Sequence, residues 1–101
     1  MTKTQKFSSG RIVTTLKISA DMAASPDFAE FVDRCLSGHF SGYWGNISES
    51  EAELNDKSIS KKQRIDSVYN VPETVTTGED EIWIITEADR SATTILYPSE
   101  Y

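Results

Sequence analysis

Acidic, basic and hydroxyl side chains crowd into one short stretch near the C-terminus: Glu87, Asp89, Arg90, Ser91, Thr93 and Thr94. In an enzyme, Glu87 or Asp89 could serve as a general base. Such a site would need a histidine, a set of metal ligands or a phosphate-binding loop beside it, and the stretch contains none of these. The competing interpretation is turn chemistry, in which Asp89 hydrogen-bonds its own turn, Arg90 bridges Glu87 or Asp89, and the threonines occupy strand positions. We therefore expect a protein that is not an enzyme, and keep a small enzyme with a site around Glu87, Asp89 and Arg90 as the alternative.

The sequence holds one cysteine and one histidine, Cys35 and His39. A metal site of the usual spacing needs more ligands of these types, so we expect neither a metal nor a cofactor. Cys35 falls within an apolar helical stripe, which favours a small buried side chain over a reactive thiol. His39 follows that stripe, and the dipole at the C-terminal end of a helix would favour its protonated form.

Glycines alternate with aromatic residues between Gly38 and Gly45, which predicts a tight corner with large flat side chains. Tyr43 and Trp44 could form a partner surface, because exposed aromatic side chains make good anchors. The pattern favours the competing interpretation, in which both rings cover an edge of the core. The full set of interaction candidates is Tyr43, Trp44, Glu87, Asp89, Arg90 and Ser91.

The element that must position the reactive stretch is a β-hairpin over residues 82–97. Its arms are rich in β-branched and aromatic residues, and residues 88–91 are the polar interruption between them. Loops of two and of four residues predict the same pairs: Glu87 with Ala92, Ile85 with Thr94, and Trp83 with Leu96. One face then carries Trp83, Ile85, Thr94 and Leu96, and the other carries Ile82, Ile84, Ile95 and Tyr97. Because both faces are apolar, we expect the hairpin inside a sheet that is covered on part of each face.

Other segments complete the expected sheet and its helices. Residues 11–19 alternate in polarity, which predicts a strand with an apolar face of Ile12, Thr14, Leu16 and Ile18. Residues 20–24 are an ambiguous connection. A serine cap and a proline begin an amphipathic helix over residues 26–37, which Gly38 can end.

Ser48 and Glu51 form a capping-box pattern that begins a second helix, which runs to about Ile59. Its apolar stripe of Ala52, Leu54 and Ile59 is thin, so we expect a surface helix. Residues 64–71 form a strand, and residues 72–80 a polar connection with a turn at Thr77 and Gly78.

We expect one α+β domain over residues 11–101, preceded by a frayed segment over residues 1–10. It has two layers and a mainly antiparallel four-stranded sheet, in the order strand, helix, helix, strand, strand, strand. The first helix packs on one face of the sheet, and the second lies on the surface.

The chain has 101 residues and a formal net charge of −6. Nucleic-acid surfaces cluster Lys and Arg, so this acidity argues against direct nucleic-acid binding and suits a basic protein partner. No apolar run approaches the roughly 20 residues that span a bilayer. No apolar segment of a secretory signal follows the N-terminal lysines, so we expect a cytoplasmic protein that does not contact a membrane.

Residues 83–94, which read Trp-Ile-Ile-Thr-Glu-Ala-Asp-Arg-Ser-Ala-Thr-Thr, resemble a motif of small uncharacterised proteins carried by plasmids and other mobile elements. The resemblance extends over residues 42–49, 55–56, 64–65, 69, 82–96 and 98–101. It implies a fold and a mobile-element setting and brings no activity. The chain departs from the family at residues 14–24 and 72–80.

These features predict a non-catalytic protein-interaction module of a mobile element, which binds a host or element protein, for example one that defends against foreign DNA. Three acidic groups, residues 27–33, 49–56 and 79–81, could imitate DNA if they share one face. The partner and the oligomeric state stay open.

Overall fold

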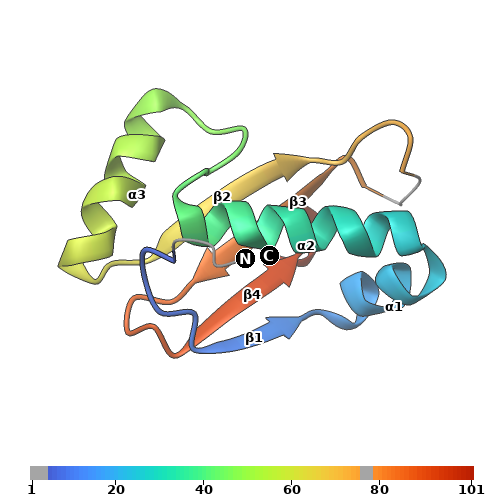
Figure 1. Ribbon diagram of the computed structural model, residues 1–101, viewed down its shortest axis with the longest axis horizontal. Helices are drawn as coiled ribbons and strands as arrows, with labels where there is room; N and C mark the ends of the chain where they lie inside the picture. Colours follow the sequence, from blue (N-terminus) through green and yellow to red (C-terminus); the bar gives the residue numbers. More distant parts are fainter. Residues whose placement is uncertain (1–4, 76–78) are drawn as a thin grey trace.

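The computed structural model of the protein describes residues 5–75 and 79–101. Its elements are β1 Arg11–Thr14, α1 Leu16–Ala24, α2 Pro26–Ser41, α3 Glu49–Lys61, β2 Ile65–Asn70, β3 Glu81–Thr86, β4 Ala92–Leu96 and the 3₁₀ helix η1 Pro98–Glu100. The strands form one mixed sheet in the order β1-β4-β3-β2, with β1 parallel to β4 and the other neighbours antiparallel. Figure 1 shows α2 crossing one face of the sheet, α1 beside it, and α3 beyond β2. The expected α+β fold is confirmed.

The β3–β4 hairpin occupies the centre of the sheet, as predicted. Ile85 pairs with Thr94 and Trp83 with Leu96, and the Glu87 N–H donates to the Ala92 carbonyl at 3.0 Å. The predicted register is therefore confirmed. The turn expected at Thr77 and Gly78 lies outside the described residues.

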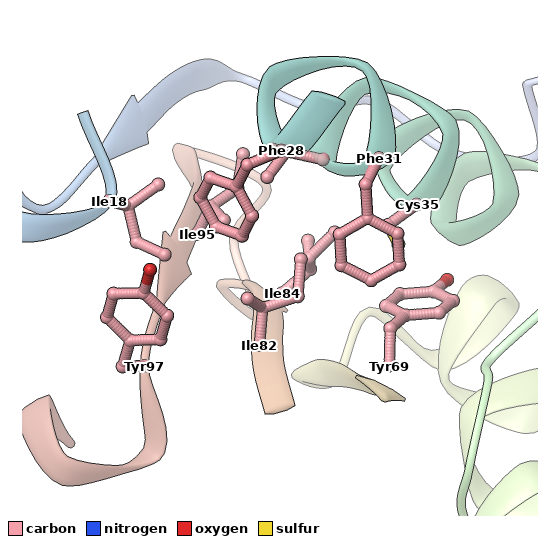
Figure 2. Packing of buried hydrophobic residues seen from close by; sticks show 10 residues of the cluster. Ile18, Phe28, Phe31, Cys35, Tyr69, Ile82, Ile84, Ile95 and Tyr97 are labelled. Carbon is pink, nitrogen blue, oxygen red and sulfur yellow. The ribbon is translucent and has the colours of Figure 1, made fainter. Parts of the chain in front are cut away.

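The main core lies between this hairpin and α2. Side-chain alternation directs Ile82, Ile84, Ile95 and Tyr97 toward the helix, and all four are buried. They pack against the buried stripe of α2, which includes Phe28, Phe31, Val32 and Cys35 (Figure 2). Ser25 begins α2 as predicted, because its hydroxyl accepts a hydrogen bond from the Phe28 N–H at 3.2 Å.

The strand expected over residues 11–19 is wrong beyond Thr14. Thr15 caps α1 instead, since its Oγ1 accepts from the Ile18 N–H at 3.3 Å. The side chain of Leu16 is 90% exposed, so the expected apolar strand face does not form. Ile18 and Met22, four residues apart, meet the core from one side of a helix, so the apolar positions of this segment suit a helical period as well as a strand period.

Helix α2 also runs further than predicted. It ends at Ser41 and Gly42 takes the left-handed conformation with φ 88°, whereas Gly38 stays helical. The reason is packing, because His39 and Phe40 continue the buried stripe by one more turn.

Of the segment expected to fray, residues 5–10 are held to the folded protein by contacts of Lys6 and Phe7, and residues 1–4 lie outside the described residues. Phe7 is buried in a second cluster with Phe40, Trp44 and Ile65. The Lys6 N–H donates to the Phe40 carbonyl at 2.8 Å, which fixes this segment to the end of α2.

Candidate functional site

A groove with a volume of about 570 Å³ lies between α2 and β2. Phe31, Cys35 and Tyr69 form its apolar floor, and these three side chains lie together in Figure 2. Its rim carries the polar side chains of Arg34, Asn46 and Asn70, together with Tyr43. We call this surface, made by these seven residues, the Tyr43 groove.

The turn after α2 holds Tyr43 at the rim. The left-handed Gly42 reverses the chain, and the Tyr43 N–H donates to the Gly38 carbonyl at 2.8 Å. The Tyr69 hydroxyl donates to the carbonyl of Tyr43. The backbone of Tyr43 is therefore bonded on both sides while its side chain stays 68% exposed.

Gly45 allows the next residues to join the sheet. Its φ is 79°, and a Cβ there would lie 2.0 Å from the Val68 carbonyl oxygen, so only glycine fits. The Val68 N–H donates to the Trp44 carbonyl at 3.1 Å, and the Asn46 N–H donates to the Val68 carbonyl at 2.6 Å. This short pairing brings Asn46 to the groove.

Trp44 points the other way, into the second cluster. Its side chain is 5% exposed, and its indole Nε1 donates to Asp56 Oδ1 at 3.0 Å. The two aromatic candidates therefore differ in burial: Tyr43 is a surface residue, and Trp44 is a core residue.

The polar rim of the Tyr43 groove offers several hydrogen-bonding groups. The Asn46 Nδ2 donates to Asn70 Oδ1 at 3.3 Å, and Arg34 lies 3.5 Å from the Glu30 carboxylate. Burial raises the pKa of the Cys35 thiol to about 12, so the floor holds a protonated, unreactive sulfur at neutral pH. The rim of the groove thus carries polar groups, and the thiol in its floor is not activated as a nucleophile.

The other candidates lie at the hairpin tip, where Asp89 and Arg90 have structural roles. Asp89 Oδ1 accepts from the Ser91 N–H at 2.9 Å, the turn bond expected of it, and the hydrogen bonds from Ser91 lower the pKa of Asp89. The side chains of Glu87 and Ser91 are exposed.

Arg90 does not bridge Glu87 or Asp89 through their carboxylates, contrary to expectation. Its guanidinium donates to backbone carbonyls, at 2.7 Å to both Gln63 and Ser58, and it also lies over the Phe7 ring. A guanidinium has five donors and can serve several carbonyls at once, including that of Ser58, which also accepts from the Gln63 N–H at 3.3 Å. Arg90 therefore ties the hairpin to α3 and to the N-terminal segment.

Thr86 and Thr93, on the strands next to the tip, point into the protein and form a hydrogen-bonded chain with His39. His39 Nδ1 lies 2.5 Å from Ser67 Oγ and Nε2 lies 2.9 Å from Thr86 Oγ1. Thr86 Oγ1 lies 2.8 Å from Thr93 Oγ1, which donates to the Ser9 carbonyl. Burial lowers the pKa of His39 to about 3, so the ring is neutral at pH 7 and the expected protonated form is wrong.

Two of the three acidic groups of the sequence, on α2 and on β3, point to opposite sides of the sheet. The α2 acids Asp27, Glu30 and Asp33 are exposed on the side of the helix opposite its buried stripe, away from the sheet. Glu81 alternates with Ile82 and so faces the other side of the sheet. Helix α3, which carries the group between them in sequence, lies beyond β2 (Figure 1). The condition for DNA imitation, a shared face, is not met by these groups.

Comparison of the chain with protein-family models, with curated proteins and with solved structures finds no match. The resemblance of residues 83–94 to mobile-element proteins stays a prediction. Within residues 5–75 and 79–101, no helix is long and apolar enough to cross a membrane. The same residues contain no group of three or more His, Cys, Asp or Glu side chains that could hold a metal ion.

Sequence reasoning found Tyr43 but missed the rest of its groove. Arg34 and Asn46 carry no pattern of their own, and Tyr69 and Asn70 come from a distant strand. The one local feature of the sequence that points to the groove is the pair of glycines at positions 42 and 45. Both have positive φ in the structure, and they shape the corner that carries Tyr43.

Proposed function

We propose that the protein is a non-catalytic interaction module that binds a segment of a partner protein in the Tyr43 groove. The observation that carries the proposal is Tyr43 itself, an exposed ring on a hydrogen-bonded backbone beside an apolar floor. An aromatic side chain whose backbone is already fixed loses little entropy on binding, which is typical of the residues that dominate interface energies.

The groove suits a segment with one apolar side chain and main-chain groups free to bond. The floor accepts the apolar side chain, and the amides of Asn46 and Asn70 lie at the rim. Asp66 and Val68 turn their main-chain groups away from β3. Because outward residues alternate along a strand, the N–H and C=O groups of Asn70 also point away from β3, and Asn70 lies beside the groove.

The net charge of the chain favours a basic partner. It is −6, whereas the lining of the Tyr43 groove contains, among the described residues, one charged residue, Arg34. Arg34 is itself paired with Glu30, so it adds little free positive charge to the rim. The resemblance to mobile-element proteins supports a cytoplasmic host or element protein as the partner, such as one that acts on foreign DNA and carries a basic surface.

The test compares two tyrosines with the same 68% exposure, Tyr43 in the groove and Tyr101 beside Trp83 of the sheet. The tagged full chain recovers a partner from host lysate, and affinities are then measured with the purified partner. We expect Tyr43→Ala to weaken binding by about tenfold or more and Tyr101→Ala to leave it unchanged. Equal affinity of both variants and the wild type would remove the groove as the contact.

Two further measurements separate the alternatives. Affinity for the partner should fall as salt rises, because acidic and basic surfaces attract less when screened, and a flat salt dependence would contradict the basic partner segment. The double variant Glu87→Gln, Asp89→Asn should bind as the wild type does. A loss of binding confined to that variant would move the site to the hairpin tip.

A further inference from the structure

The two edges of the sheet differ in how their outward main-chain groups are satisfied. On β2, the side-chain amide of Asn55 pairs with Asp66, since Nδ2 donates to the Asp66 carbonyl at 2.7 Å and Oδ1 accepts from its N–H at 3.3 Å. Residues 44–46 bond to Val68 in the same way. This edge is therefore largely occupied by the chain itself.

The β1 edge is open. The Arg11 N–H donates to the Ser91 carbonyl and the Thr15 N–H to the Ile95 carbonyl, so the odd-numbered residues face β4. By alternation, Ile12 and Thr14 turn their N–H and C=O groups away from the sheet. No hydrogen bond from a described residue is found at these outward groups.

Apolar side chains accompany these free groups. Ile12 is 50% exposed and Leu16, at the start of α1, is 90% exposed. An open strand edge beside exposed apolar side chains is a template for another strand. Figure 1 shows β1 at the margin of the sheet, with α2 displaced toward the other strands.

We propose that β1 pairs antiparallel with β1 of a second copy of the chain, about a two-fold axis at Val13. This register places Ile12 opposite Thr14 of the second copy. Both residues have outward N–H and C=O groups, so the two Ile12–Thr14 pairs form four main-chain hydrogen bonds. Every outward donor and acceptor of the short strand then has a partner, which is why this strand is complementary to itself.

The charges at this edge also suit a second copy. Residues 11–17 contain Arg11 and Lys17 and no acid. The two-fold register places Arg11 opposite Thr15 of the second copy, so the two Arg11 side chains lie at opposite ends of the pair. At Thr15 the hydroxyl donates to Glu100 Oε1 at 2.9 Å, which brings a carboxylate to the end that receives Arg11.

The test is the mass of the full chain in solution, measured by light scattering over a range of concentrations. We expect the wild type to reach the mass of two chains, and the variants Thr14→Pro and Ile12→Lys to keep the mass of one. Thr14→Pro removes only an outward N–H, which an edge strand tolerates, and circular dichroism checks that both variants fold. The control Leu54→Lys changes an apolar residue that is 60% exposed on α3 and should leave the two-chain mass intact.

Hydrogen exchange of the wild type supplies a second readout. The Ile12 and Thr14 amides should exchange rapidly when dilute and slowly when concentrated, whereas the inward Val13 amide should be slow in both cases. A one-chain mass at every concentration, or a two-chain mass in both edge variants, would overturn the proposal. Because Tyr43 lies away from β1, Tyr43→Ala should retain the two-chain mass, so this result and that of the binding test are independent.

Discussion

His39 joins three strands from the inside of the protein. Its two nitrogens contact Ser67 of β2 and Thr86 of β3. The Thr86 hydroxyl is in turn hydrogen-bonded to the hydroxyl of Thr93 on β4. Every buried side-chain nitrogen and oxygen of the described residues has a hydrogen-bond partner. A buried polar network is stabilising only when it is complete in this way, so each member depends on the others.

The buried imidazole makes stability depend on pH. Its pKa is about 3 in the folded protein, below the ordinary value of 6.5, so the unfolded chain takes up a proton between these values that the folded chain does not. Stability is therefore full above about pH 6.5 and falls as pH decreases toward the folded pKa. From about pH 7.5 to about pH 5 we expect a loss of about 2 kcal/mol in the free energy of unfolding.

Urea unfolding at a series of pH values measures this loss. The window lies above the ordinary pKa values of Asp and Glu, so carboxylates contribute little to it. The control His39→Gln has no titrating ring and should show a much flatter dependence in the same window. A wild-type slope equal to that of the variant would show that His39 does not take up the proton on unfolding.

Among the elements, the β3–β4 hairpin is the best protected. It has a neighbouring strand on both sides, and Ile82, Ile84 and Ile95 are fully or almost fully buried. Opening these amides requires the main core to open, whereas β1 and α3 can open locally. We expect the slowest amide exchange at residues 83–85 and 94–96, measured by NMR. Slow exchange confined to the helices would contradict the central role of the hairpin.

The elements that the sequence predicted well are those with a single consistent signal. The hairpin has one register for either loop length, and Ser48 with Glu51 forms the capping box that begins α3. Residues 11–19 carried two signals, an alternating pattern and the cap at Thr15, and the cap prevails because α1 then directs Ile18 into the core. The rim of the Tyr43 groove depends on tertiary contacts between α2, the following turn and β2, which no local pattern encodes.

At the scale of the whole molecule, the N-terminal segment closes the second cluster. The Phe7 ring lies 5.4 Å from both His39 and Phe40 and 6.1 Å from Trp44, between centroids. We expect Phe7→Ala to lower the free energy of unfolding by about 3 to 5 kcal/mol, the usual effect of emptying a buried aromatic site. Chemical denaturation measures it, with the exposed Lys6→Ala as the neighbouring control, which should change stability by less than about 0.5 kcal/mol. Equal effects of the two substitutions would mean that the segment does not belong to the core.

Asn55 determines how far the sheet can grow. A sheet with two open edges can add strands without limit, which is the geometry of fibres. Here the Asn55 amide occupies Asp66, and residues 44–46 occupy Val68, so that Asn70 alone is left at the end of β2. Chains that join through β1 consequently present a blocked β2 at each outer side, and assembly stops at a closed pair. The buried Asn55 amide and residues 44–46 together thus convert a strand edge that could seed aggregation into a terminus.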